Sequence, residues 1–165
     1  MDTLEINDVI EQVLMLARGE LQNRDILVRT ELMATLSRLR GDRVQLQQVL
    51  LNLVTNAIQA MAEVRDRPRI LTIRSQLHER DNVLVEVEDS GIGLDPTSIQ
   101  QIFGSMFTTK PDGMGMGLSI SRSIVAAHGG RLWASPRDGF GAIFRIILRT
   151  EPASGPTSGQ NLTNI

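Results

Sequence analysis

Neutral amide side chains recur on one side of the longest helical segment in the sequence, residues 42–62. The segment has no charged residue after Arg43, whereas the exposed face of a helix normally carries Lys and Glu. The amides fall on one helical stripe, three or four residues apart: Gln45, Gln48, Asn52, Asn56 and Gln59. Asn52 and Asn56 can direct two amide oxygens at a cation bound to phosphate, and such oxygen ligands suit Mg²⁺. A weakly polar surface stripe or a subunit contact explains the pattern equally well.

A carboxylate, Asp89, stands at the end of a strand expected over residues 82–89. It has the same parity along this strand as three apolar residues: Val83, Val85 and Val87. Asp89 should therefore point toward the buried face, where a carboxylate needs hydrogen-bond donors. Gly91 and Gly93 leave room for a ligand beside the backbone, and the amino group of adenine is one suitable donor. The alternative is a turn in which Asp89 binds local amides.

A third candidate is the alternating glycine sequence 113–117, directly before a helix expected over about 117–128. Glycines let consecutive amides point at phosphate oxygens, and a helix N-terminus adds a favourable dipole. The spacing fits neither a dinucleotide-binding fingerprint nor a Walker loop, because no strand directly precedes it and no Gly-Lys-Ser/Thr follows. A flexible loop is the alternative.

Composition limits the functions that these candidates can serve. The length of 165 residues suits one compact domain. A net charge of −2 and only four Phe and one Trp argue against a nucleic-acid partner. With no Cys and two His, thiolate chemistry and a three-His zinc site are excluded. The sequence lacks a signal peptide and any apolar run near the ~18 residues of a membrane span, so we expect a cytoplasmic domain without direct membrane contact.

The elements that must position these residues follow from the remaining patterns. Residues 7–22 have helical periodicity, with Asn7 as a plausible N-cap. Strands are expected over 25–31, 36–40, 69–78, 82–89, 131–135 and 142–149. We expect His128, in the last turn of its helix, to interact with the helix dipole, and residues 151–165 to form a disordered tail. This order predicts a helical layer on one face of a mixed sheet.

Taken together and in this order, the segments resemble the catalytic ATP-binding domain of two-component sensor histidine kinases, over residues 1–150. The wider superfamily includes gyrase-type, heat-shock-chaperone and mismatch-repair ATPases. Four segments are similar to the family's boxes: 52–57 to the N box, 89–93 to the first glycine box, 102–103 with 107–110 to the phenylalanine box, and 113–117 to the second glycine box. The sequence after Thr108 is most similar to kinases with PAS-type sensor modules, including oxygen sensors.

The resemblance implies an α+β fold of the Bergerat type, a two-layer α/β sandwich in which helices cover one face of a mixed sheet. It implies ATP and Mg²⁺ as ligands, with Asn56 as metal ligand and Asn52 assisting at the metal and phosphates. Asp89 would bind the adenine amino group, and residues 95–116 would form a mobile lid. The other residues expected at the nucleotide are Gly91, Gly93, Thr109, Lys110, Gly113, Gly115, Gly117 and Leu118.

The sequence departs from the family pattern in three places. Residues 104–106 replace the usual Glu-Pro-aromatic sequence of the phenylalanine box. Gln59 stands where many relatives have Lys, so a phosphate contact would come from elsewhere, with Lys110 and Arg122 as candidates. Neither histidine has the context of a phospho-acceptor, so no catalytic residue is named, and the acceptor helix would lie on an N-terminal portion or on another protein.

We therefore expect a protein-histidine kinase domain that donates the γ-phosphate of Mg-ATP to a histidine on a separate dimerisation and acceptor domain, with a response regulator downstream. Hydrolytic relatives carry a Glu one turn before the Mg²⁺-binding Asn, where this chain has Asn52, and an amide cannot take a proton from water. Slow hydrolysis is therefore expected. Two alternatives remain: a stand-alone serine kinase resembling anti-sigma-factor kinases, and a module that binds ATP without transferring phosphate.

Overall fold

The computed structural model describes residues 1–94 and 115–151 of the chain. The helices of this part are α1 (Ile6–Asn23), α2 (Arg43–Ala60) and α3 (Gly115–Ala127). The strands are β1 (Asp2–Leu4), β2 (Ile26–Leu32), β3 (Leu39–Gly41), β4 (Arg69–His78), β5 (Asn82–Asp89), β6 (Arg131–Pro136) and β7 (Ala142–Arg149).

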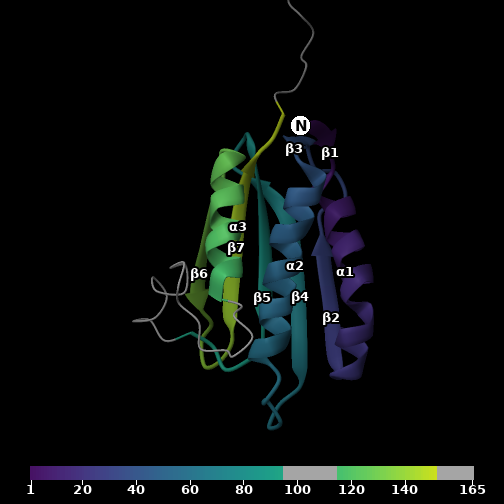
Figure 1. Ribbon diagram of the computed structural model, residues 1–165, viewed down its shortest axis with the longest axis vertical. Helices are drawn as coiled ribbons and strands as arrows, with labels where there is room; N and C mark the ends of the chain where they lie inside the picture. The colour runs from purple at the N-terminus through teal and green to yellow at the C-terminus, as the bar shows by residue number, and fades with distance from the viewer. Residues whose placement is uncertain (95–114, 152–165) are drawn as a thin grey trace, which may run out of the picture.

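Five of the described strands form one mixed sheet in the order β2-β4-β5-β7-β6. β2 runs parallel to β4, and the other neighbours are antiparallel. The three described helices lie side by side on one face of this sheet (Figure 1). β1 and β3 form a separate antiparallel pair. The predicted two-layer α+β architecture, a mixed sheet with helices on one face, is confirmed.

The core lies between the sheet and the helices, because the period-2 alternation of the strands turns one set of side chains inward. Ile73, Val87 and Phe144 are opposite one another in β4, β5 and β7, and each is almost fully buried. The outward positions include ion pairs, such as the bond that Arg145 donates to the Glu86 carboxylate at 2.9 Å. The same alternation carries Asp89, the last residue of β5, to the buried side.

Helix α2 separates its two faces as the amide pattern predicts. Its N-cap, Asp42, accepts a hydrogen bond from the Gln45 backbone N–H at 3.1 Å. The apolar side chains opposite the amides are all buried: Leu46, Leu50, Leu53, Ala57 and, just beyond the helix, Met61. The amide side chains lie on the remaining face, where Asn52 reaches α3.

The predicted N-cap of the first helix is wrong. α1 begins at Ile6, and its N-cap, Glu5, makes no side-chain capping bond. Asn7 is instead inside the helix, where its Nδ2 donates to the Met33 carbonyl at 2.9 Å and its Oδ1 accepts from the Ser75 hydroxyl at 2.7 Å. Its polar groups therefore connect α1 to the sheet, which is a tertiary contact that local sequence does not specify.

His128 joins two helices through hydrogen bonds at both of its ring nitrogens. Its Nε2 accepts from the Asp42 backbone N–H at 3.0 Å, and its Nδ1 lies 2.8 Å from the Ile124 carbonyl. Both contacts together require the tautomer with the proton on Nδ1. His128 therefore links the end of α3 to the start of α2, and its contact with a carbonyl of the last turn is compatible with the expected role at the helix end.

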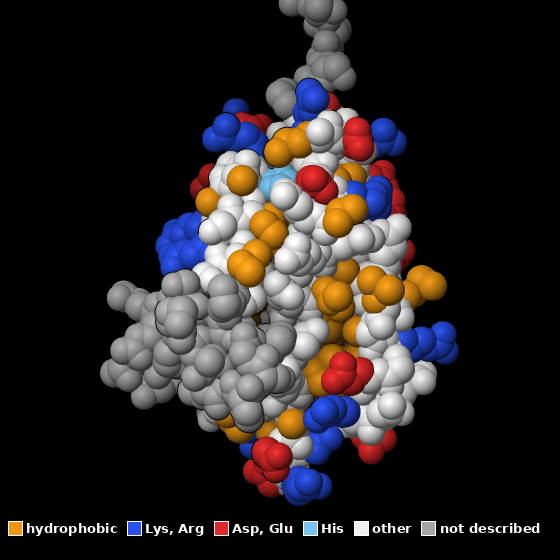
Figure 2. All heavy atoms as spheres, in the orientation of Figure 1, with side chains coloured by type: hydrophobic (Ala, Val, Ile, Leu, Met, Phe, Trp, Pro, Cys, Tyr) orange, Lys and Arg blue, Asp and Glu red, His pale blue; other side chains and the backbone are white. Residues whose placement is uncertain are grey.

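The helix-covered face carries exposed hydrophobic side chains in small groups among polar ones (Figure 2). Met15 and Leu16 of α1 are the most exposed of these on the first helix. None of the helices in the described ranges combines the length and the apolar character that crossing a bilayer requires.

Candidate functional site

The predicted site residues of the described segments gather at one end of the molecule. The C-terminal end of α2, the end of β5, the start of α3 and the β6–β7 turn all lie at the lower end of the ribbon in Figure 1. Backbone contacts tie them together: the Ile92 N–H donates to the Ala60 carbonyl at 3.1 Å. A Cβ on Gly117 would lie 3.5 Å from Nδ2 of Asn52.

Asp89 is the most buried ionisable group of this site, with 1% of its surface exposed. Its Oδ1 accepts from the Gly91 backbone N–H at 2.8 Å, and the Ala142 backbone also donates to the carboxylate. Burial raises the pKa of Asp89 from 3.8 to about 6. The two N–H groups and the charge of Arg137 lower this pKa, whereas Glu88 raises it. The carboxylate thus binds local amides, as the alternative interpretation required, and it is also the polar group around which the site is built.

The two glycines after Asp89 are required by the protein's own backbone. A Cβ on Gly91 would lie 2.5 Å from the Ala60 carbonyl oxygen, closer than real Cβ atoms approach. Gly93 has a φ of +85°, and its Cβ would lie 3.0 Å from the Gly141 carbonyl oxygen. Because of these close approaches, the segment after β5 packs tightly against the end of α2 and the β6–β7 turn.

Asn52, the first of the two α2 amides, contacts the start of α3. Nδ2 of Asn52 donates to the Gly117 carbonyl at 3.3 Å and to the Ser121 hydroxyl at 3.1 Å. Both bonds use the amide nitrogen, so Oδ1 is the atom of Asn52 that can face a ligand. Asn56 lies one turn further along the same face and is half-buried.

The glycines before the third helix are partly inside it. α3 begins at Gly115 and includes Gly117, whereas the sequence placed the start of the helix near residue 117. The Leu118 side chain is buried in the core, so any contact of this residue with a nucleotide would use its backbone. Thr109, Lys110, Gly113 and the remaining lid positions up to residue 114 lie outside the described residues, as do the phenylalanine box and the tail from residue 152 onward.

Sequence reasoning missed three side chains that surround the backbone of the Asp89 segment. Arg67 donates from Nη2 to the Gly91 carbonyl at 2.7 Å, and Arg137 donates from Nη1 to the Asp89 carbonyl at 3.1 Å. Phe140 lies against both guanidinium groups. The signal available in the sequence was the pair Gly139 and Gly141 on either side of Phe140. In the structure both glycines have positive φ, which is typical of a tight turn.

The donor set fits a metal ion that arrives with a nucleotide. Among the described residues, no three His, Asp or Glu side chains are grouped so that they could hold a metal ion by themselves. Two amides provide neutral oxygen atoms, and Mg²⁺ bound to few protein ligands usually keeps phosphate and water oxygens as its other ligands. Asn52 and Asn56 are therefore suited to Mg²⁺ only together with phosphates.

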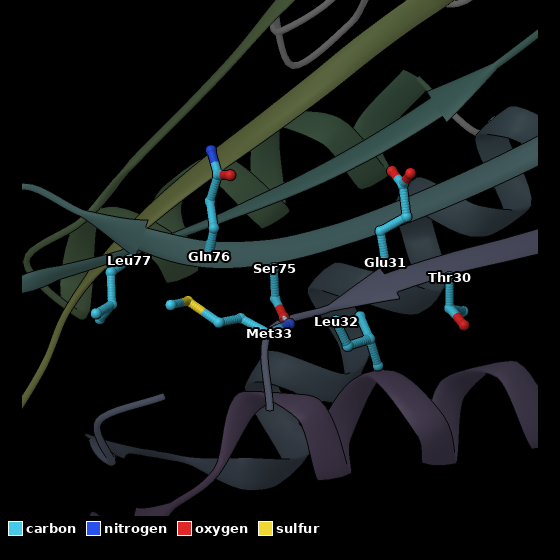
Figure 3. A pocket seen from close by; sticks show the side chains of 7 residues that line it. All are labelled: Thr30, Glu31, Leu32, Met33, Ser75, Gln76 and Leu77. Carbon is cyan, nitrogen blue, oxygen red and sulfur yellow. Dashed lines mark hydrogen bonds between the residues drawn. The ribbon is translucent and has the colours of Figure 1, made fainter. Parts of the chain in front are cut away.

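An open groove elsewhere has no features of a ligand site. It lies along β2 and β4 and is lined by Thr30, Glu31, Leu32, Met33, Ser75, Gln76 and Leu77. Figure 3 shows Glu31 and Gln76 pointing to the opposite side of the strands from Ser75 and Leu32. The lining therefore straddles the edge of the sheet rather than enclosing a cavity, and we assign it no ligand.

Comparison with known proteins identifies the family. Residues 41–152 match the family described as histidine kinase-, DNA gyrase B-, and HSP90-like ATPase. The chain belongs to this family. The likeness extends to the catalytic domain of the histidine kinase ThkA, with a TM-score of 0.81 and 32% identity over 90% of this chain and 95% of that one. The predicted resemblance to the ATP-binding domain of sensor histidine kinases is confirmed.

Curated relatives of this ATPase-family domain are named as sensor proteins and sensor histidine kinases. The chain is 41% identical to the sensor protein FixL of Bradyrhizobium diazoefficiens over 87% of its length, and 37% identical to the sensor histidine kinase ZraS of Salmonella typhimurium over 90%. It spans 28% and 31% of these two relatives, respectively. The PAS-linked subgroup stays a prediction, because neither the structure nor these comparisons test it.

Proposed function

We propose that this domain binds Mg-ATP and donates the γ-phosphate to a histidine on a separate dimerisation and acceptor domain. The observation that carries the proposal is the buried carboxylate of Asp89, held at the same end of the molecule as the α2 amides and the start of α3. A carboxylate acceptor suits the adenine amino group, and a helix N-terminus suits phosphate. The name of the relative ZraS, a sensor histidine kinase, supports the same function.

The arrangement favours transfer over hydrolysis. Phosphoryl transfer depends mainly on positioning and on neutralisation of charge, which Mg²⁺ supplies when it is bound with ATP. Asn52 and Asn56 would hold the metal and phosphates through neutral oxygens, and neither can act as a base toward water at neutral pH. Among the residues named at the site, the ionisable group with a raised pKa is Asp89, which we assign to adenine. The acceptor must then come from another domain.

The partners and location follow from this role. We infer a dimerisation and acceptor domain of the same kinase as immediate partner and a response regulator downstream, in the cytoplasm where ATP is available. The structure of ThkA in complex with the response regulator protein TrrA, 30% identical to this chain over the aligned part, supports the second partner. Neither a nucleic acid nor a membrane surface is part of the proposal.

The test is transfer of labelled phosphate from ATP to a purified acceptor domain of a sensor histidine kinase, with this chain as the only source of kinase. Acid-labile label on the acceptor supports the proposal. Acid-stable label on a serine of an added protein would favour a kinase of the anti-sigma-factor type. ATP binding without any transfer would reduce the function to nucleotide binding.

A further inference from the structure

Two arginines from separate loops hold three consecutive carbonyl groups at the proposed adenine site. Arg67, between α2 and β4, donates from Nε to the Ser90 carbonyl at 3.0 Å and from Nη2 to the Gly91 carbonyl at 2.7 Å. Arg137, in the β6–β7 turn, donates from Nη1 to the Asp89 carbonyl at 3.1 Å. These bonds fix the peptide planes that follow β5.

Both guanidinium groups also contact one aromatic ring, that of Phe140. The Cζ atom of Arg67 lies 4.2 Å from the ring centroid, and the Cζ atom of Arg137 lies 5.5 Å from it. Both distances are within the ~6 Å range of cation–π attraction. Phe140 is 40% exposed, and both cations lie against its ring. The ring is therefore shared by the two arginines that bind the Asp89 segment.

The β6–β7 turn, which carries Phe140, packs directly against the backbone of Asp89. Gly141 has a φ of +84°, and a Cβ there would lie 2.1 Å from the Asp89 carbonyl oxygen. The turn is closed by a bond from the Arg137 N–H to the Gly141 carbonyl at 3.1 Å. A displacement of this turn must therefore displace the end of β5.

We propose that Phe140 is a positioning residue for nucleotide selectivity: through Arg67 and Arg137 it holds segment 89–91 in the orientation that presents the Asp89 carboxylate to adenine. The inference rests on the proposed function and deepens it, because it assigns part of the selectivity for the base to Phe140 in addition to the Asp89 carboxylate. Loss of the ring loosens the adenine end of the site. The amides of α2 and the start of α3, which we assign to the phosphates, stay in place.

The experiment measures the dissociation constants of Mg-ATP and Mg-GTP by isothermal titration for the wild type and three variants. Phe140→Leu removes the aromatic face and keeps an apolar side chain, whereas Phe140→Tyr keeps the ring. Trp133→Leu is the matched control, because it removes a second cation–π contact, 4.9 Å from Cζ of Arg131, on the outward face of β6. We expect Phe140→Leu to weaken ATP binding about 5-fold, which corresponds to ~1 kcal/mol, and to reduce the preference for ATP over GTP by a similar factor. The tyrosine variant and the control keep the wild-type values.

Arg67→Lys provides an independent arm. It keeps the charge but loses the paired bonds to the carbonyls, so it should reduce the ATP preference even if Phe140→Leu does not fold, and an unchanged preference would contradict the inference. If both variants fold, their effects should not add. Wild-type protein that fails to bind ATP would overturn the proposed function and this inference with it. Wild-type binding with an unchanged ATP/GTP ratio in folded Phe140→Leu, or an equal weakening for both nucleotides, would overturn this inference alone.

Discussion

Neutralising Asp89 should stabilise the ligand-free domain while it damages nucleotide binding. The folded-state pKa of this carboxyl is about 6, against 3.8 for the ordinary group, and the first cause is burial. The folded protein therefore binds the proton more tightly than the unfolded chain does. The resulting penalty to stability is absent below pH ~4, grows as the pH rises, and is complete above pH ~6.

The size of the penalty follows from the two pKa values. A rise from 3.8 to about 6 corresponds to roughly 3 kcal/mol at neutral pH. Asp89→Asn removes the charge but replaces one carboxylate oxygen by an NH₂ donor, which weakens the acceptance from the Gly91 and Ala142 N–H groups and costs about 1 kcal/mol or more. The variant should therefore be about 1–2 kcal/mol more stable than the wild type at pH 7.5, a rise in Tm of roughly 2–8 °C for a domain of this size. This advantage should disappear near pH 4.

Binding should change in the opposite direction. We expect only the ionised carboxylate to accept a hydrogen bond from adenine. With a pKa of about 6, Asp89 is ionised in about 97% of the wild-type protein at pH 7.5 and in about 9% at pH 5. The affinity for ATP should therefore fall about 10-fold between these two pH values. Phosphate groups also titrate near pH 6. The Asp89→Asn variant is therefore the baseline, and the quantity measured by isothermal titration is the ratio of wild-type to variant affinity at each pH.

Two results would refute this reasoning. A constant ratio between pH 5 and 7.5 would show that the ionised form of Asp89 does not bind the base. An Asp89→Asn variant less stable than the wild type at pH 7.5, by thermal or denaturant unfolding, would show that the charge is not costly where the structure places it.

Four further outcomes are expected. Gly91→Ala should lose about 1–3 kcal/mol of stability by chemical denaturation, because its Cβ would lie 2.5 Å from the Ala60 carbonyl oxygen. Gly19→Ala is the control and should be neutral or stabilising, because no atom lies within 4 Å of the position of its Cβ. Asn52→Ala, which breaks the bonds to Gly117 and Ser121, should weaken Mg-ATP binding more than it lowers Tm, and equal ATP affinity would contradict its assignment. Chelation of Mg²⁺ by EDTA should weaken ATP binding in titration calorimetry, whereas an unchanged affinity would contradict the metal assignment. The chain incubated alone with labelled ATP should stay unlabelled, and acid-labile label on either histidine would contradict this.

Regular periodicity in the sequence predicted most of the fold. The expected strands 69–78, 82–89 and 142–149 match β4, β5 and β7 at both ends, because alternating apolar residues and flanking turn residues define them locally. The short strand β1 was not predicted, since its three residues pair with β3 and carry little pattern of their own. The misassigned role of Asn7 has the same origin, in contacts with residues far along the chain.

The site was predictable where one element defines it and not where several meet. Parity along β5 predicted the inward direction of Asp89, and helical spacing predicted the shared face of Asn52 and Asn56. The interpretation of Gly91 as room for a ligand was incomplete, because the position is occupied by the protein's own backbone at Ala60. No local pattern in the sequence shows that the β6–β7 turn lies against Asp89.

The contact between Gly91 and Ala60 connects the two halves of the proposed nucleotide site. Ala60 ends α2, the helix that carries the amides assigned to Mg²⁺ and phosphate, and Gly91 follows the carboxylate assigned to adenine. The Ile92 N–H donates to the same Ala60 carbonyl at 3.1 Å, so the two elements are held together by both packing and a hydrogen bond. The separation between the metal end and the base end is therefore set by backbone atoms rather than by flexible side chains. If the proposed assignments hold, the glycine at position 91 contributes to nucleotide binding by fixing this separation.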